Sequence, residues 1–259
     1  MASEAAGFRR TELMAICAAR EIRDGDVAFI GTGLPMLGGM LAKYTTAPHC
    51  ILVFESGSVD ARPTRTPLSI GDPCLVPGSV MQAGLAEVFG LLLQPGYVDL
   101  GFIGAAQIDP RGNLNTTVIG PYETPKVRLP GSGGGNDIGS LAKRVVVIMK
   151  QDARKFVEHV DYVTTPGYLD GPGGRERAGL PRGGPSAVIT DLGVYRFDDG
   201  TKEIVLESCH PGVSVDEVRR NVSWDLRVDR TVRTTRRPTK RELRILRTKC
   251  DPDGIFLGA

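Results

Sequence analysis

The apolar residues of this chain come in short runs bounded by turn residues, a pattern typical of buried strands that alternate with helices. Four-residue runs at Val27–Ile30 and Ile51–Phe54 predict parallel strands. Apolar residues at helical spacing predict helices over 11–22 and 36–44. Two strands joined by a helix form a parallel pair with a right-handed crossover. We therefore expect an α/β fold with an open, mostly parallel sheet flanked by helices.

The same pattern continues towards the C-terminus. Thr11 is the expected N-cap of the first helix, and Asp109–Asn113 has the composition of a β-turn. Residues 162–185 are dense in glycine and proline, which predicts a long ordered loop, because apolar strands resume after it. No linker or internal repeat divides the chain, so residues 1–259 are predicted to form a single domain. The remaining predicted elements are a helix at 81–93, apolar on most sides, and strands at 98–103, 145–149, 187–189 and 204–206.

Composition narrows the class of protein without naming its function. The 259 residues are 41% hydrophobic and 24% charged with a net charge of +2, which is ordinary for a globular protein and gives no reason to expect nucleic acid binding. No apolar run reaches the length of about 18 residues that would predict a transmembrane helix. The first ten residues lack the apolar core of a signal peptide, so a cytoplasmic protein with no membrane partner is expected.

Two further features of the composition bear on partners. The five cysteines include no CxxC pair, so neither a disulfide framework nor a metal site is expected. Residues 227–249, the basic tail, contain ten Lys or Arg residues and two acidic residues. We expect the basic tail to be a solvated face that contributes to a subunit contact rather than to nucleic acid binding.

Glu55 is the first candidate for a chemical role, because it directly follows the strand Ile51–Phe54. Ligands of open α/β sheets bind in the crevice beyond the carboxyl ends of the strands. A glutamate has an ordinary pKa of about 4.3 and is ionised at neutral pH. It can attack a thioester, because a thiolate can reopen the mixed anhydride that forms. Three interpretations are open: Glu55 attacks a substrate, binds one, or caps a helix N-terminus.

Gly31–Gly33 matches the beginning of a dinucleotide-binding fingerprint, and Glu55 follows at about the twenty-residue spacing expected of a ribose-binding acid. The third glycine of that fingerprint would fall on Met36, and Pro35 interrupts the motif. The sequence therefore favours a tight strand-to-helix turn whose helix N-terminus is open to an anion.

A second glycine-rich stretch, Gly131–Gly135, is followed by Asn136. It lacks the Lys-Ser/Thr of a phosphate-binding loop. Its backbone N–H groups could stabilise the oxyanion that develops during acyl transfer, and a plain flexible turn is the alternative. A serine hydrolase is not favoured, because the chain has no Gly-x-Ser-x-Gly motif and none of its three histidines lies in a glycine-rich loop.

Several blocks of the sequence occur together, in one order, in a known family. They are GTGLP at Gly31–Pro35, ESG at Glu55–Gly57, FIGAAQIDP at Phe102–Pro110, GSGGG at Gly131–Gly135 and DYVTTPGYLDGPGGRER at Asp161–Arg177. On these blocks the chain resembles the β subunit of a class I coenzyme A transferase, nearest the glutaconate CoA-transferase branch, and the resemblance covers roughly residues 10–210.

The resemblance implies an open α/β subunit whose active site lies at the interface with a separate α subunit, in an α2β2 or larger assembly. It implies that Glu55 accepts the acyl group of an acyl-CoA and then forms a covalent glutamyl-CoA thioester, which an incoming carboxylic acid, for example a dicarboxylic acid, resolves. Gly133 and Gly134 fall where backbone amides stabilise the oxyanion. Coenzyme A is a substrate, and no cofactor or metal is expected. The residues expected to bind substrate or CoA are Gly31, Gly33, Ser56, Gly57, Arg62, Gly135 and Asn136.

The chain departs from the family pattern in places. Many class I transferases have Ser-Glu-Asn-Gly around the nucleophile, whereas this chain has Phe54–Gly57, FESG, which fits the glutaconate branch and leaves the role of Ser56 open. Asn136 follows three glycines where relatives often have Gly-Gly-Ala-Met. Arg62 and Arg65 could hold a second carboxylate or a CoA phosphate, or be solvated loop charges.

Related branches of the fold lack the glutamate and act as ring-opening hydrolases on steroid-derived CoA esters or as decarboxylases. Glu55 therefore favours a transferase. The alternative on the same fold is an acyl-CoA hydrolase or a C–C bond-cleaving lyase, since water can also cleave a glutamyl intermediate. A non-catalytic subunit, whose basic tail docks an α subunit or another acidic surface, is a further alternative.

Overall fold

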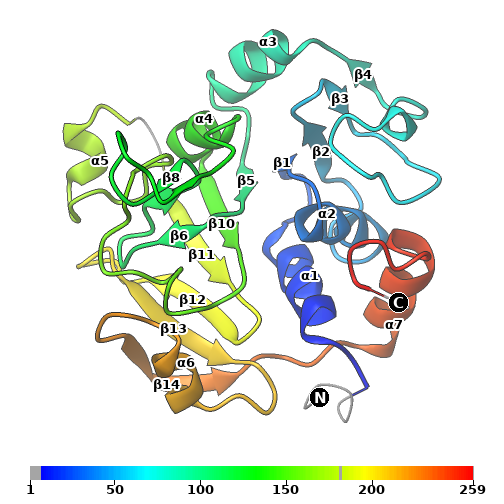
Figure 1. Cartoon of the computed structure of the whole chain (residues 1–259). Helices are drawn as coiled ribbons and strands as arrows, with labels where there is room; N and C mark the ends of the chain where they lie inside the picture. Colours follow the sequence, from blue (N-terminus) through cyan, green and yellow to red (C-terminus); the bar gives the residue numbers. More distant parts are fainter. Residues whose placement is uncertain (1–6, 181–182, 259) are drawn as a thin grey trace. The chain divides into compact units, whose positions relative to one another are not determined.

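The computed structural model describes residues 7–180 and 183–258. The chain forms two compact units, the first built from Met1–Phe102 and Arg237–Ala259 and the second from Ile103–Arg236 (Figure 1). The single-domain assignment remains a prediction, because compactness does not measure whether a unit folds alone. Within the described ranges, no helix is both long and apolar enough to cross a membrane.

The sheet of the first unit is centred on a parallel trio of strands. Strand β1 (Val27–Ile30) lies between β2 (Ile51–Phe54) and β5 (Leu100–Ile103) and is parallel to both. β1 and β2 pair residue for residue, from Val27 opposite Ile51 to Ile30 opposite Phe54. Their carboxyl ends are therefore level, and Gly31 and Glu55 leave the sheet at the same edge.

Two short antiparallel strands extend this sheet beyond β2, namely β3 (Ser58–Val59) and β4 (Met81–Gln82). The prediction of a helix over 81–93 is wrong in its first part. Met81 and Gln82 pair with β3 instead, and helix α3 (Leu85–Glu87) begins after Gly84 and continues as a π-helix over Val88–Leu93. Tertiary pairing overrides the helical propensity of these residues.

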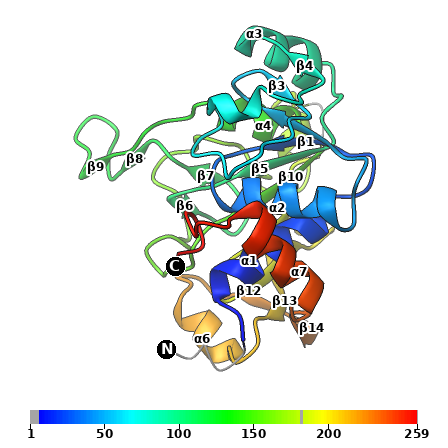
Figure 2. The ribbon, with the colours of Figure 1, turned by 90° about the vertical axis from the view of Figure 1, so that its right-hand side faces the viewer.

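Three helices pack together in the first unit, as both views show (Figures 1 and 2). They are α1 (Arg10–Glu21), α2 (Leu34–Tyr44) and α7 (Lys240–Ile245), which a π-helical turn continues to Cys250. α1 packs against α2. The predicted helices at 11–22 and 36–44 are confirmed, but the N-cap is Arg9 rather than Thr11, because the Glu12 carboxylate accepts the Arg9 N–H at 2.7 Å and the helix begins one residue earlier.

The second unit has its own run of five strands. β10 (Arg144–Ile148) and β11 (Pro185–Ile189) are parallel and almost fully buried, as their unbroken apolar runs predict. β12 (Gly193–Phe197) and β13 (Ile204–Cys209) continue antiparallel, and β14 (Arg227–Thr234) adds a parallel edge strand. Smaller elements complete the unit: the hairpins β6 (Gln107–Ile108)/β7 (Leu114–Asn115) and β8 (Val118–Ile119)/β9 (Val127–Arg128), and helices α4 (Gly135–Leu141), α5 (Gly174–Arg177) and α6 (Val215–Arg220).

The predicted fold class, an open and mostly parallel sheet with flanking helices, is confirmed. The sequence did not reveal β12 or the structure within the basic tail, which contributes β14 and α7. Most side chains of β14 are exposed. The role of the basic tail in a subunit contact stays a prediction.

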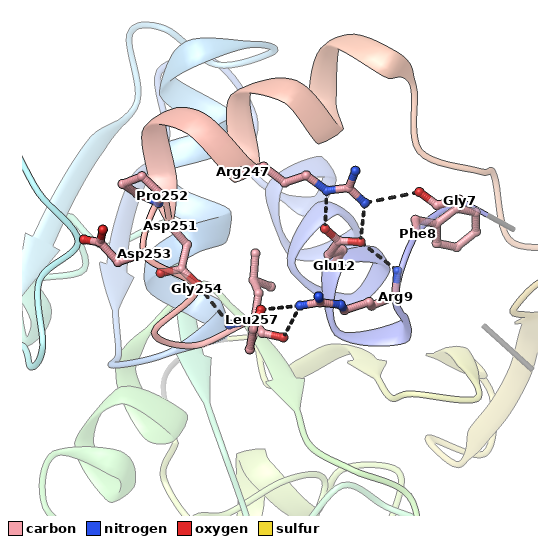
Figure 3. Close-up of a pocket in the computed structure, with 11 residues that line it drawn as sticks. Gly7, Phe8, Arg9, Glu12, Arg247, Asp251, Pro252, Asp253, Gly254 and Leu257 are labelled. Carbon is pink, nitrogen blue, oxygen red and sulfur yellow. Dashed lines mark hydrogen bonds and ion pairs between the residues drawn. The ribbon is translucent and has the colours of Figure 1, made fainter. Parts of the chain in front are cut away.

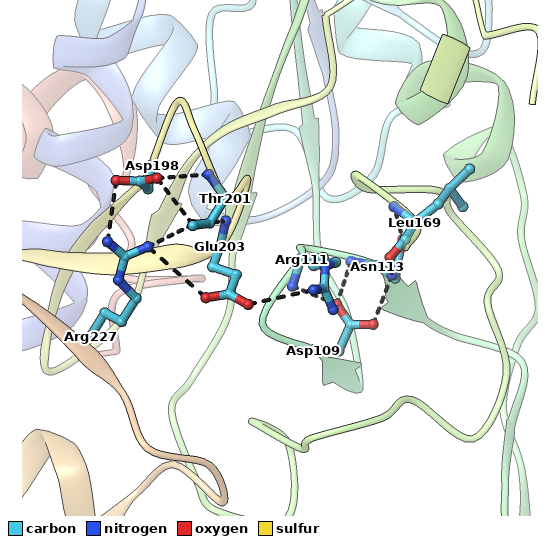
Figure 4. Close-up of polar contacts among 8 residues, drawn as sticks. All are labelled: Asp109, Arg111, Asn113, Leu169, Asp198, Thr201, Glu203 and Arg227. Carbon is cyan, nitrogen blue, oxygen red and sulfur yellow. Dashed lines mark hydrogen bonds and ion pairs between the residues drawn. The ribbon is translucent and has the colours of Figure 1, made fainter. Parts of the chain in front are cut away.

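A buried polar network holds Gly167 and Leu169 of the glycine- and proline-rich stretch 162–185, of which residues 181–182 lie outside the described ranges. Asp109 accepts hydrogen bonds from the N–H of Arg111 and from both the N–H and side-chain amide of Asn113 (Figure 4). Asn113 in turn accepts the N–H groups of Gly167 and Leu169. Burial raises the pKa of Asp109 above its usual value, although these donors oppose the shift. The predicted β-turn at Asp109–Asn113 is confirmed by the bond from Gly112 N–H to Asp109 C=O at 3.0 Å. The description of residues 162–185 as one long ordered loop stays a prediction, and within that stretch Gly174–Arg177 form helix α5.

The two ends of the described chain meet in the first unit through a charged pair (Figure 3). Arg247 donates two hydrogen bonds to the Glu12 carboxylate, at 2.6 and 2.9 Å, and one to Gly7 C=O. Arg9 donates to the carbonyls of Leu257 and Gly258, and these segments border a pocket of about 560 Å³. Burial alone would raise the pKa of Glu12, but the hydrogen bonds and charges of Arg247 and Arg9 outweigh it and hold the pKa below its usual value.

We expect Glu12→Gln to lower the free energy of unfolding by about 1–2 kcal/mol at neutral pH, since the buried carboxylate faces a half-exposed guanidinium that water partly screens. A lowered pKa stabilises the fold above the ordinary pKa of glutamate, and this contribution is lost as the pH falls through the folded-state value. Urea unfolding should therefore show that the difference in unfolding free energy between variant and wild type becomes smaller as the pH is lowered from about 7 to about 3. The exposed Glu158→Gln should show no gap, and a pH-independent loss in Glu12→Gln would contradict the assignment.

Candidate functional site

Glu55 occupies a tight turn directly beyond β2. The turn closes with a hydrogen bond from Gly57 N–H to Phe54 C=O at 2.9 Å, which places Glu55 and Ser56 at its two corners. β3 follows, so no helix begins here and the helix-cap interpretation of Glu55 is wrong. The side chain is half-buried, and within residues 7–180 and 183–258 no hydrogen bond or ion pair engages its carboxylate. Both carboxylate oxygens are thus available for chemistry.

Gly57 makes this turn possible. Its φ of +112° lies in a region that residues with side chains rarely adopt. Its carbonyl accepts the Ala83 N–H at 3.0 Å, and a Cβ atom at position 57 would overlap the Ala83 carbonyl. The glycine therefore locks the turn that carries Glu55 against the segment before α3.

Ser56 and the glycines after β1 border the same edge of the sheet. The Ser56 hydroxyl donates a hydrogen bond to Ile70 C=O at 2.5 Å. Its proton is therefore engaged, but its oxygen can still accept a hydrogen bond. Gly33, with φ +87°, ends the strand-to-helix turn, and the first helical bond runs from Leu37 N–H to Gly33 C=O at 3.1 Å. No side chain among the described residues caps α2, which leaves its first N–H groups open to an anion, although Pro35 contributes none.

The two arginines of the following loop differ. Arg65 forms a bidentate pair with Asp72, at 2.7 and 2.8 Å, so its guanidinium is occupied. Arg62 is exposed and lines a cavity of about 240 Å³ whose buried lining residues include Met40 and Leu52. Asp60 N–H bonds to Leu52 C=O, so the chain after β3 runs back towards the beginning of β2. Arg62 therefore lies away from the Glu55 end of the strand.

In the second unit, the glycine-rich loop is anchored at its start. Gly131 exchanges two hydrogen bonds with Thr116, from its N–H to Thr116 C=O at 2.8 Å and to its C=O from the Thr116 hydroxyl at 2.7 Å. Gly131 and Gly133 both have positive φ, +96° and +49°, so only glycine fits without strain. The loop runs directly into α4, which begins at Gly135.

The N–H groups of this loop fall into two classes. Those of Gly135 and Asn136 bond to the carbonyl and hydroxyl oxygens of Ser132, at 2.9 and 3.1 Å. In the described part of the chain, the N–H groups of Gly133 and Gly134 form no hydrogen bond. The Asn136 side chain donates to Thr164 C=O at 2.9 Å, which gives it a structural task besides the predicted binding role. Both glycines predicted to stabilise an oxyanion thus have free donors, and so does Ser132, whose N–H forms no hydrogen bond within residues 7–180 and 183–258.

Sequence reasoning missed three residues that support this loop. Ser132 binds the two N–H groups just described, Thr165 packs beneath α4, and Arg175 bonds to the carboxyl end of α4. The Asp161–Arg177 block contains the last two and is distinctive, but its pattern does not show which of its residues turn inward.

Comparison with known proteins identifies a family for the chain as a whole. The model of the family described as coenzyme A transferase matches residues 11–221. The chain belongs to the coenzyme A transferase family. The predicted resemblance and the predicted enzyme class are thereby confirmed.

Individual relatives of this CoA-transferase family chain cover nearly all of it. It is 43% identical over 93% of its length to a subunit of the 3-oxoadipate CoA-transferase of Pseudomonas knackmussii, 92% of which is covered. It is 39% identical over 96% to a subunit of the glutaconate CoA-transferase of Acidaminococcus fermentans, covered to 95%. The crystal structure of glutaconate coenzyme A-transferase from that organism matches with a TM-score of 0.92 and 36% identity, covering 97% of this chain and 98% of that one.

A more distant relative carries a different name. The IpdB subunit of the cholesterol ring-cleaving hydrolase of Rhodococcus jostii is 29% identical over 86% of this chain and 83% of its own length. Several of these relatives are named as one subunit of an enzyme, which agrees with the predicted need for a second subunit.

The turn beyond β2 gives a test of how strictly its backbone is constrained. We expect Gly57→Ala to lose at least about 3 kcal/mol of unfolding free energy, because left-handed strain adds to an overlap with the Ala83 backbone. Gly25 has φ +84° with open space around it, so Gly25→Ala should lose only the strain, about 1–2 kcal/mol. Urea unfolding of both variants measures the difference. Equal losses would show that the close approach to Ala83 is unimportant.

Proposed function

We propose that the chain is the β subunit of a CoA-transferase that moves coenzyme A from an acyl-CoA donor to a carboxylic acid through a covalent intermediate on Glu55. The observation that carries the proposal is the Glu55 carboxylate, which lies unpaired on a glycine-locked turn at the carboxyl end of a parallel strand in a member of this family. The locked turn fixes the backbone that carries this carboxylate, and the side chain has no ion pair to give up before it attacks a thioester.

The proposed reaction needs only carboxylate and thiolate exchanges. A Glu55 oxygen attacks the thioester carbonyl, and the tetrahedral intermediate expels the CoA thiolate to give a mixed anhydride. The thiolate then attacks the glutamyl carbonyl of that anhydride, which releases the donor acid and leaves a glutamyl-CoA thioester. The acceptor carboxylate repeats the two steps in reverse, so that Glu55 is regenerated and the CoA thiolate ends on the acceptor. Each step conserves charge, and no cofactor is consumed because CoA is itself a substrate.

Each attack creates an oxyanion that needs hydrogen-bond donors. We assign this task to the N–H groups of Gly133 and Gly134. The fixed backbone donors of such a loop stabilise developing charge without reorganising, and removing one such donor typically costs about 10²–10³-fold in rate. The support is the division of the loop, in which neighbouring N–H groups are bonded to Ser132 and these two are not.

The proposed substrates include a dicarboxylic acid, because the relatives at 43% and 39% identity are named for 3-oxoadipate and glutaconate, both dicarboxylic acids. The position of Arg62 favours binding of a CoA phosphate rather than of the second carboxylate of the acid. It lines its cavity with Leu52, which precedes Glu55 by three residues or about 10 Å along a strand. That separation suits a phosphate of extended CoA better than the second carboxylate of a short acid. The α subunit, in an α2β2 or larger cytoplasmic assembly, completes the proposed site.

Glu55→Gln should lower kcat/KM for CoA transfer by at least about 10³-fold, because the amide cannot form the anhydride. Mixing wild-type enzyme with acyl-CoA and then borohydride should convert Glu55 to the alcohol, detectable by peptide mass spectrometry, and block turnover. Exposed Glu123→Gln is the matched control and should behave as wild type. Retained transfer in Glu55→Gln would overturn the nucleophile assignment, provided that assembly with the α subunit is intact in both variants.

A panel of acceptors tests the reaction type and the substrate class together. With one acyl-CoA donor, we expect a second acyl-CoA to form only when an acid is added, and glutarate to exceed valerate by at least about 10-fold in kcat/KM, equivalent to about 1.4 kcal/mol. Chromatography of the CoA species gives the readout. Free CoA accumulating without an acceptor would instead indicate a hydrolase, and equal use of both acids would contradict the dicarboxylate proposal.

A further inference from the structure

Arg175 is a buried cation with an unusual set of partners. Its side chain lies in the second unit on α5 and is only 4% exposed. One terminal nitrogen, Nη1, donates to the carbonyls of Pro166 and Gly167 at 3.2 and 3.0 Å. The other, Nη2, donates to those of Gly139 and Ser140, both at 3.1 Å. Burial lowers the pKa of Arg175 from its ordinary value. An arginine nevertheless remains charged in proteins.

Two of these carbonyls belong to the last turn of α4. The final carbonyls of a helix have no partner within the helix and carry the negative end of its dipole. Here the helix end is buried, since both Gly139 and Ser140 are buried, so these carbonyls need donors from elsewhere in the protein. Arg175 supplies them and adds a positive charge where the dipole favours one.

Two further contacts hold α4 against residues 164–167, the segment that includes the Pro166 and Gly167 carbonyls. The Asn136 side chain bonds to Thr164 C=O near the start of the helix. A Cβ atom at Gly139 would clash with the Thr165 Cγ2 methyl, so the helix backbone lies directly on this side chain. α4 therefore has no room to slide along segment 164–167 while the Arg175 bonds persist.

We propose that Arg175 is a positioning residue for CoA transfer, which holds α4 by its carboxyl end and thereby fixes the Gly133 and Gly134 N–H groups at its other end. The two ends are separated by about 9 Å, the rise of six helical residues. Arg175 touches neither substrate nor reacting atoms in this assignment, which rests on the proposed function. A lysine cannot replace it, because an ammonium group lacks the planar fork that reaches two pairs of carbonyls at once.

The test compares Arg175→Lys with Arg177→Lys in the enzyme assembled with its α subunit. Arg177 lies on the same helix α5 but is exposed and pairs with Asp170. We expect Arg175→Lys to lower kcat by about 10–100-fold while KM for acyl-CoA stays within about 3-fold, since displaced donors weaken the transition state more than binding. Hydrogen–deuterium exchange of amides 131–141 should accelerate in Arg175→Lys alone. Arg177→Lys should match wild type in every readout.

Other outcomes decide against the proposal. A folded Arg175→Lys with wild-type kcat, or with raised KM and unchanged kcat, overturns it. If the enzyme transfers no CoA, the proposed function fails separately, and unchanged amide exchange in Arg175→Lys then overturns the positioning role itself.

A second pair of variants covers the case in which Arg175→Lys does not assemble. Gly139→Ala leaves Arg175 itself unchanged but pushes α4 off Thr165, and it should lower kcat in the same manner. Thr165→Ser removes the clashing methyl and should restore kcat in the double variant. Wild-type kcat in Gly139→Ala, or no recovery in the double variant, would show that the position of α4 does not control the reaction.

Discussion

Close contact between helix α2 and its neighbours, made through bare backbone, is the constraint on which the first unit depends. A Cβ atom at Gly38 would lie 2.8 Å from that of Ala18 on α1, and one at Gly39 would lie 3.1 Å from Ile30 and 3.3 Å from Leu52. Two adjacent glycines therefore let one helix contact another helix on one side and two strands on the other. Close packing of this kind transmits small displacements. α2 thereby packs closely against β1 and β2, whose residue-for-residue pairing puts Gly31 and Glu55 at the same edge of the sheet.

In the second unit, close packing of a helix against its neighbour depends on a buried arginine, Arg175. Removing a guanidinium from water is costly unless its donors are bonded, and Arg175 donates a hydrogen bond to each of four carbonyls. These acceptors are themselves buried and would be costly to leave unpaired. One side chain thus satisfies the end of a helix and the turn at Pro166–Gly167. A hydrophobic replacement would leave four carbonyls without these donors. The main contribution of Arg175 to the fold is therefore its hydrogen bonds rather than its positive charge.

The sequence predicted what depends on local pattern and missed what depends on distant partners. β1, β2 and α2 were found because apolar period and turn glycines are local signals, and Glu55 was identified because it follows such a strand. The helix expected from Met81 was wrong at its start, since pairing with β3 decides that segment. Arg175 appeared as one charge among several in a glycine-rich block. Only the fold shows that it turns inward while Arg177 stays exposed.

The same dependence on context governs the chemistry. In the proposed mechanism a glutamyl thioester can be attacked by a carboxylate or by water, and both reactions start from the same intermediate on Glu55 and use the same oxyanion donors. The choice between transfer and hydrolysis is therefore set by how well water is excluded while the acceptor acid is bound. Glu55 is half-buried in this subunit alone, so the exclusion of water has to come from whatever covers the turn. Under the proposed function, bound CoA, the acceptor and the α subunit do so. In this proposed mechanism the chain supplies the reacting carboxylate, and the molecules that cover Glu55 determine whether water or the acceptor acid reaches the intermediate.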